Sequence, residues 1–153
     1  MGKIGKFNFR ELEKFKQGLE SMSDPDAFVE SCAKELAARL LAKVIKRTPV
    51  GDYPKSSGKK GGTLRRGWTG EKRASASGYV DSLSVNHSGN TYTIEIINPV
   101  EYASYVEYGH RTANHKGWVS GMFMMTISEQ ELQAIAPKVL ERKIQKYMRG
   151  LIG

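Results

Sequence analysis

Apolar positions that recur every three or four residues predict a long helix in the first third of the chain. One apolar face continues over residues 28–44. Asp24 is placed to cap this helix, and Pro25 suits its first turn. Pro49 ends it, because a proline disfavours helical geometry in the residue before it. The pattern therefore predicts a helix over residues 25–47.

Two further segments show the same helical period. Residues 8–22 predict a narrower amphipathic helix with Asn8 as its cap, and its single apolar stripe suits either its own domain or a neighbouring protein. Ser128 and Glu131 form a capping box that predicts the start of a final long helix. Pro137 lies inside that helix and removes one backbone hydrogen bond, so we expect a kink or two separate segments there.

Alternation of apolar and polar residues predicts an antiparallel hairpin in the second half of the chain. Residues 82–86 and 91–97 alternate in this way, and Gly89 and Asn90 between them suit the positive φ angles of a tight turn. A further short strand is expected over residues 63–69. The whole pattern predicts an α+β fold, in which a small antiparallel sheet of three to four strands packs against long N-terminal and C-terminal helices.

Two long segments of loop composition interrupt these elements. Residues 50–62 are rich in glycine and lysine and predict a long basic loop, and residues 70–78 are a second stretch poor in apolar side chains. Neither requires a domain boundary, so we expect a single domain over residues 1–153. Its core is expected between the sheet and the helix over residues 25–47. The expected core residues are Leu64, Trp68, Ile94, Ile96, Tyr102 and Val106.

Aromatic side chains are concentrated between residues 98 and 125. Asn98 as a cap and Pro99 at the first position predict a short helix there, and Gly109 supplies the left-handed residue that ends it. A loop is expected to follow and to close on residues 117–121, whose glycines allow a tight turn around an anchored tryptophan. Such a segment suits a surface held by a neighbouring molecule, because aromatic side chains bury a large area at low entropic cost.

The candidate interface residues share an aromatic or basic side chain and lie in the aromatic segment, in the basic loop or just after that loop. They are Tyr102, Tyr105, Tyr108, His110, Arg111, Trp118, Phe123, Lys55, Lys59, Lys60, Arg65 and Arg66. Two interpretations of the arginine pair before Trp68 stay open. The arginines could contact phosphate beside a base stacked on the tryptophan, or Trp68 could fill the core while one arginine reaches a carboxylate.

Composition places the chain among globular proteins with an excess of positive charge. Its 153 residues and 17.1 kDa suit one domain, and the net charge of +8 would suit a nucleic-acid-binding module. No apolar run approaches the length of a membrane span and no secretory signal pattern occurs, so we expect a protein of the cytoplasm with no membrane partner. The single cysteine, Cys32, is expected to be a small buried apolar side chain.

Motifs for catalysis do not occur in the sequence. His110 and His115 lack the fixed spacing that a helix gives to metal ligands. We find no phosphate-binding loop, nucleophile elbow, zinc-protease motif or dinucleotide-binding fingerprint. The sequence therefore predicts a protein that is not an enzyme, with no catalytic, cofactor or metal site.

The order of four motifs resembles one known family, the head–tail joining or tail-completion proteins of long-tailed bacteriophages and related prophages. The motifs are residues 47–50 (RTPV), residues 62–68 (GTLRRGW), residues 98–103 (NPVEYA) running into 105–111 (YVEYGHR), and residues 117–119 (GWV) running into 121–124 (GMFM). The resemblance covers most of the chain after Ala27. The chain departs from the family pattern in one place, where residues 51–61 lengthen the loop between the first two motifs.

The resemblance implies a structural, non-enzymatic protein that completes the tail and joins it to the head connector as part of a neck ring. It implies a virion protein of the neck or head-proximal tail, assembled in the host cytoplasm as a homo-oligomeric ring of six copies. The implied partners are the head connector or stopper protein and the tail terminator or tail-tube proteins, with non-specific contact to passing DNA. A basic nucleic-acid-binding module is the alternative.

A closed ring requires two different complementary patches on each subunit. One candidate patch is the segment over residues 101–123. The other is the N-terminal helix or the 50–62 loop, whose lysines are expected to contact acidic surfaces.

Overall fold

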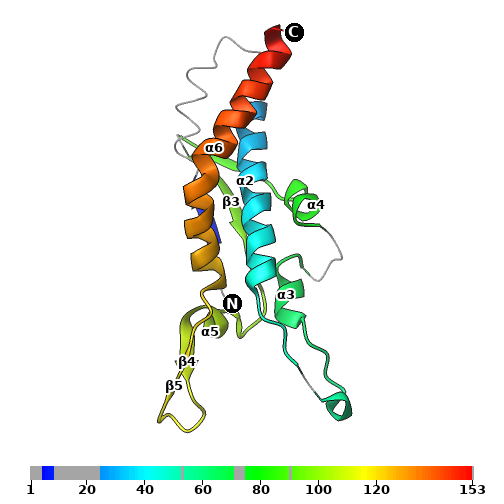
Figure 1. Ribbon diagram of the computed structural model, residues 1–153, viewed down its shortest axis with the longest axis vertical. Helices are drawn as coiled ribbons and strands as arrows, with labels where there is room; N and C mark the ends of the chain where they lie inside the picture. Colours follow the sequence, from blue (N-terminus) through cyan, green and yellow to red (C-terminus); the bar gives the residue numbers. More distant parts are fainter. Residues whose placement is uncertain (1–4, 9–24, 53, 71–74, 90, 153) are drawn as a thin grey trace.

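Two long helices form the body of the molecule (Figure 1). The computed structural model describes residues 5–8, 25–52, 54–70, 75–89 and 91–152. Helix α2 (Pro25–Arg47) and helix α6 (Met124–Ile152) lie side by side along the longest axis. The predicted helix over residues 25–47 is confirmed, and so is the α+β fold class.

Helix α2 is the centre of the core because its apolar face is covered along its whole length. Val29, Leu40 and Val44 are completely buried, and the helix contacts α6, strand β3 (Thr91–Ile96) and helix α4 (Ala76–Asp81). Cys32 lies on the same face and is buried, as predicted. Burial raises the pKa of its thiol to about 11.

Polar contacts fix α6 against α2. Glu131 accepts hydrogen bonds from Arg47 and from Lys43, whose Nζ lies 3.1 Å from Oε2 of the glutamate. Arg47 also donates to Ser128 Oγ over 3.1 Å. The expectation that Ser128 and Glu131 cap the start of the final helix is therefore wrong. Helix α6 begins at Met124, and both side chains serve its contact with α2.

Helix α6 contains a proline within its length. It continues through Pro137 as one helix, so the alternative of two separate segments is wrong. Figure 1 shows the helix changing direction near its middle. Pro137 is also near the middle of the range Met124–Ile152. A bend there follows from the backbone hydrogen bond that proline cannot make.

The sheet has three antiparallel strands in the order β1-β3-β2. Strand β1 (Gly5–Asn8) and strand β2 (Asn86–Ser88) flank β3. Every second residue of β3 is buried, which confirms the alternation predicted there. The buried residues are Tyr92, Ile94 and Ile96. This face of the sheet packs on α2.

The first strand of the predicted hairpin lies further along the chain than expected. Residues 82–85 follow α4 in a turn, and only residues 86–88 pair with β3. Leu83 and Val85 are half-buried and pack against the core from this turn. Their alternation marked inward-facing positions correctly but did not require a strand.

Of two further predictions, one near the N-terminus and one in the hairpin turn, only the second falls on described residues. The predicted helix over residues 8–22 lies outside the described residues, except for Asn8, which ends β1. In the turn between β2 and β3, Gly89 has a φ of +57°, the left-handed geometry expected there.

The predicted strand over residues 63–69 is wrong, because Thr63–Gly67 form helix α3. Leu64 and Trp68 are four residues apart, which places both on one face of a helix, and both are buried. Gly62 precedes the helix with a φ of +95°, a conformation that favours glycine.

The second predicted loop, over residues 70–78, includes the start of a helix. Within it, Ser75 accepts a hydrogen bond from the backbone N–H of Gly78 over 3.1 Å and so caps α4. Val80 then anchors this short helix in the core.

The predicted core is largely confirmed, with one clear error. Leu64, Trp68, Ile94 and Ile96 are buried, and Val106 is half-buried against the same cluster. Tyr102 is 43% exposed. Helix α5 (Ala103–Tyr108) turns Ala103 and Glu107 inward instead, which leaves the tyrosine before it on the surface.

Candidate interaction surface

Two extensions project from the same end of the molecule (Figure 1). One is the basic loop over residues 50–62, which carries a short 3₁₀ turn at Lys55–Ser57. The other is an antiparallel hairpin of strand β4 (Gly109–Arg111) and strand β5 (Trp118–Ser120). The loop predicted after Gly109 is therefore wrong, since its backbone pairs with itself.

Glycines allow the hairpin to approach α5 closely. Gly109 ends the helix, as predicted, but it combines a φ of +91° with an extended ψ of 174° in place of the expected left-handed helical conformation. A Cβ there would lie 2.5 Å from the Val119 carbonyl oxygen. A Cβ on Gly121 would lie 2.3 Å from the Glu107 carbonyl oxygen. Any larger residue at either position would push the hairpin away from its support.

A buried carboxylate joins the base of the hairpin to α6. Glu107 accepts hydrogen bonds from the backbone N–H groups of Met125 and Thr126, both over 2.8 Å, and from Thr126 Oγ1 over 2.6 Å. It therefore caps the first turn of α6, where unpaired N–H groups and the helix dipole favour a negative charge. The backbone of Phe123 adds a hydrogen bond to the Glu107 carbonyl over 3.0 Å. The hairpin is thus held at its base by both helices.

Sequence reasoning missed Glu107. The residues that it binds lie 18 and 19 positions further along the chain, so no local capping pattern contains it. A glutamate in the middle of an aromatic segment was the one available signal.

The start of α5 also differs from its prediction. Asn98 does not cap this helix, because its side chain accepts from the backbone N–H of Val100 and donates to the Leu64 carbonyl over 2.7 Å. The Asn98 side chain fits because Gly67 has no Cβ, which would lie 2.3 Å from its oxygen. The contact fixes the segment before α5 against α3.

The base of the basic loop is fixed around Thr48. Trp68 Nε1 donates to Thr48 Oγ1 over 2.8 Å, and the hydroxyl donates in turn to the Val44 carbonyl. Arg65 donates twice to the Thr48 carbonyl, over 2.8 and 3.2 Å. Arg65 therefore satisfies a carbonyl at the C-terminal end of α2.

These contacts decide between the two interpretations of the arginine pair. Trp68 fills the core, and Arg66 donates to the Gly61 carbonyl over 3.2 Å. The guanidinium groups reach carbonyl oxygens of their own chain, and not the carboxylate that the second interpretation assigned to one of them. A base stacked on Trp68 is excluded because the indole is completely buried.

Most of the large exposed apolar side chains gather on α5, the hairpin and the start of α6. Trp118 is 62% exposed, so it is not the anchored aromatic that the flanking glycines suggested. The other members are Tyr102, Tyr105, Tyr108, Val119, Met122, Phe123 and Ile127. His110 lies beside Tyr105, with ring centroids 5.7 Å apart, and its buried Nδ1 makes no hydrogen bond to any of the described residues. Exposed patches of this kind are typical of surfaces that bind other proteins.

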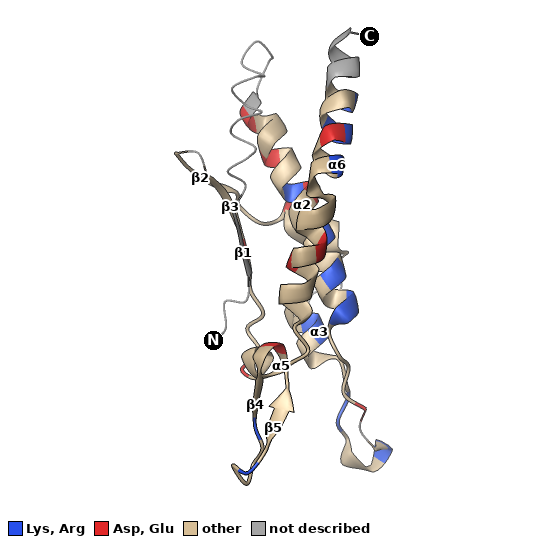
Figure 2. Cartoon of the chain, turned by 60° about the vertical axis from the view of Figure 1, so that its left-hand side comes forward, with Lys and Arg blue, Asp and Glu red and all other residues tan. Residues whose placement is uncertain are grey.

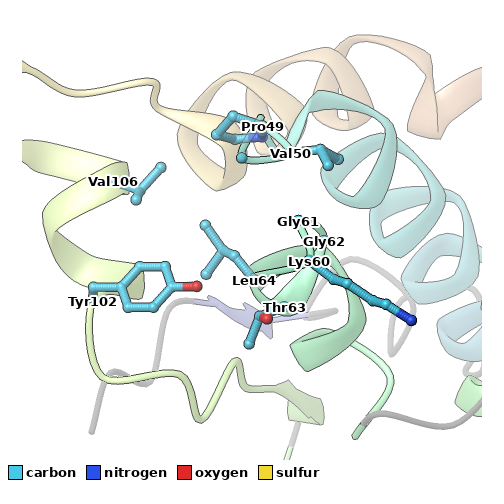
Figure 3. A pocket seen from close by; sticks show the side chains of 10 residues that line it. Pro49, Val50, Lys60, Gly61, Gly62, Thr63, Leu64, Tyr102 and Val106 are labelled. Carbon is cyan, nitrogen blue, oxygen red and sulfur yellow. The ribbon is translucent and has the colours of Figure 1, made fainter. Parts of the chain in front are cut away.

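A small pocket of about 210 Å³ lies between the bases of the two extensions (Figure 3). Pro49 and Val50 bound it on the loop side, Leu64 on the side of α3, and Tyr102 and Val106 on the side of α5. We call it the root pocket. It is smaller than the roughly 300–1,000 Å³ of typical small-molecule sites.

Positive charge accompanies the exposed apolar surface (Figure 2). Lys55, Lys59 and Lys60 are exposed on the loop, and Arg111 and Lys116 are exposed on the hairpin. Within the described parts of the chain, no group of three or more histidine, cysteine, aspartate or glutamate side chains is placed to hold a metal ion. Among the described helices, none combines the length and apolar character needed to cross a bilayer.

Comparison with protein families matches the sequence to one class, the tail components of bacteriophages. Residues 13–109, more than half of the chain, match the family model described as "Bacteriophage HK97-gp10, putative tail-component". The chain belongs to this family, so it is a structural component of a phage tail and hence of the virion. Neither a curated protein nor a solved structure matches the chain.

Proposed function

We propose that this tail component completes the tail and joins it to the head connector as part of a neck ring. One observation carries the proposal. At the end with two extensions, exposed tyrosines on α5 lie next to a hairpin that carries the exposed Trp118 and that α5 and α6 hold in place. Pre-organised surfaces of this kind bind partners without a large loss of conformational entropy. The protein acts by binding, without catalysis.

The proposed ring contains six copies of the chain, and each chain forms a single domain. Each copy needs two different complementary patches for the ring to close. The exposed face of α5, with Tyr105 and Tyr108, supplies one patch in this proposal. The head connector or stopper protein lies on one side of the ring, and the tail terminator or tail-tube proteins lie on the other.

Deleting the gene from its phage tests the joining function directly. The proposal predicts filled heads and tails that fail to join or to function, seen by electron microscopy, and a loss of infectious particles. Supplying the gene in trans should restore joined particles. Normal infectious particles from the deletion would contradict the proposal.

The copy number has its own test. Class averages of the purified protein, alone or on isolated tails, should show sixfold rotational symmetry. Averages with twelvefold symmetry or with none would refute a ring of six.

The net charge of +8 favours a nucleic-acid-binding module as the second candidate. It predicts DNA affinity that falls steeply with salt, because each phosphate contact releases counterions. The neck-ring proposal expects weak, non-specific DNA contact only. A DNA titration at two salt concentrations, with a size measurement of the same sample, separates the two, and tight, sequence-selective binding by a monomer would favour the second.

A further inference from the structure

The end with the two extensions combines positive charge, exposed apolar side chains and the root pocket. We define the basic end by Lys55, Lys60, Arg111, Lys116 and Trp118. We infer that the basic end docks onto a different protein, one with an acidic surface and a protruding apolar side chain that enters the root pocket. This inference rests on the proposed function and names the chemistry of one partner.

Charge on the extensions indicates an acidic partner. The loop over residues 50–62 has three lysines against one acidic residue, Asp52, and residues 109–121 have Arg111 and Lys116 with no acidic residue. All five basic side chains are exposed. Two copies that met through this end would bring like charges together, which is unfavourable at an interface. An acidic surface is complementary to both extensions.

The root pocket indicates an apolar contact at the centre of this surface. Leu64 and Val106 form its inner wall, and Val50 at its edge is 47% exposed. Figure 3 shows the Tyr102 ring reaching across the pocket toward Leu64 and Thr63. Its volume of about 210 Å³ suits one large side chain and is too small for a helix. A buried anchor surrounded by charged residues is the usual anatomy of a protein interface.

The same features argue against nucleic acid as the occupant. Positioning contacts to a duplex come from cations, polar side chains and backbone N–H groups, and the aliphatic walls of the root pocket add nothing to them. Arg65 and Arg66, which follow the pocket residue Leu64 in the sequence, already donate to carbonyl oxygens of the chain.

Both extensions are held at their bases, so the surface is present before a partner binds. Gly61 packs directly on the Gly51 carbonyl, and this contact leaves no room for a Cβ at residue 61. The hairpin base is fixed through Glu107, which accepts from the first turn of α6. The two bases from which the cations project are therefore held in place by the fold.

The test uses two probes, the filled heads and the isolated tails purified from the deletion lysate. Wild-type protein should sediment with one of them, less strongly as salt increases. The paired variants Lys55→Glu/Lys60→Glu and Arg111→Glu/Lys116→Glu should each weaken this binding about tenfold or more. The control pair Lys46→Glu/Lys138→Glu changes net charge equally at exposed positions outside both extensions, and should stay within about threefold of wild type.

One further variant separates the pocket from charge alone. Val50→Arg adds a cation while it obstructs the pocket, so it should weaken binding to the particle about tenfold. It should leave binding to a duplex DNA fragment unchanged or slightly stronger. Particle binding that Val50→Arg strengthens, together with equally tight binding to duplex DNA, would overturn the inference in favour of nucleic acid.

Restoration of head–tail joining in the deletion lysate distinguishes failure of this inference from failure of the proposed function. If wild-type protein restores joined particles and both charge-reversed pairs do so equally well, the inference is wrong and the proposed function stands. If wild-type protein restores nothing, the proposed function is wrong and the inference fails with it.

Discussion

The two tryptophans of the chain each follow a glycine, yet they occupy opposite environments. Trp68 on α3 is completely buried, and its indole N–H donates to Thr48 Oγ1. Trp118 on β5 is 62% exposed at the end of the molecule that carries the extensions. The first holds the base of the loop to the core, whereas the second stands on a hairpin held in place from below. Similar local sequence thus serves stability in one region and is available for binding in the other.

Replacing the buried tryptophan should give the largest effect. Trp68→Ala should lower the free energy of unfolding by roughly 3–5 kcal/mol, because it empties a large buried site and leaves Thr48 without its donor. Chemical denaturation measures the change, and Trp68→Phe should retain part of the stability by filling most of the volume. A loss below about 1 kcal/mol for Trp68→Ala would show that this tryptophan does not support the core.

Removing the carboxylate that joins the two regions should give the next largest effect. Glu107→Ala should lower the free energy of unfolding by roughly 1–3 kcal/mol, because the N–H groups of Met125 and Thr126 lose their acceptor. Glu101→Ala is the matched control, at an exposed position just before α5, the helix that carries Glu107. Its free energy of unfolding should stay within about 0.5 kcal/mol of wild type. Equal stabilities for the two variants would contradict the capping role.

The contact between α2 and α6 should have a smaller effect on the free energy of unfolding, and this effect should depend on pH. Hydrogen bonds from Arg47 and Lys43 hold the pKa of the Glu131 carboxyl below its ordinary value of 4.5. A lowered pKa in the folded state means that the contact stabilises the fold above the ordinary pKa and loses this contribution as the pH falls through the lowered value. Wild type should therefore be more stable than Glu131→Gln near neutral pH, and the difference should shrink in acid. A difference that stays constant down to a pH of about 3 would contradict this account.

The smallest effect on stability is expected at the exposed tryptophan. The free energy of unfolding of Trp118→Ala should stay within about 0.5 kcal/mol of wild type, because the tryptophan side chain buries little area in the folded chain. The measurement is the denaturation experiment used for Trp68→Ala, and the pair sharpens the contrast between the two regions. A loss of more than about 2 kcal/mol would mean that the hairpin belongs to the folded core.

Local sequence signals predicted the elements whose causes are local. Helix α2 was predicted from Pro25 to Arg47 because its period lies within the segment and its cap and terminating proline lie within two residues of its ends. Strand β3 was predicted from its own alternation. Helix α3 was assigned as a strand because its few residues gave too little length to tell the two periods apart, although Leu64 and Trp68 have helical spacing.

The candidate surface could be predicted only in part. The aromatic and basic residues of the interface were recognised, but the hairpin that presents several of them depends on pairing between residues 109–111 and 118–120. The cap from Glu107 to α6 spans a still longer separation along the chain. Arg65 and Arg66 were assigned to an interface because their partners, the carbonyl oxygens of Thr48 and Gly61, carry no signal in sequence. Contacts set by tertiary packing leave such side chains ambiguous.

The most direct test of the central claim adds purified protein to an extract of cells infected by phage that lack its gene. The account predicts that wild-type protein restores infectious particles. It predicts that Trp118→Ala leaves the free energy of unfolding unchanged but restores at least about tenfold fewer infectious particles than wild type. The reason is that an exposed tryptophan at an interface is a common binding hot spot. Full restoration by Trp118→Ala would contradict the claim that this end of the molecule performs the joining.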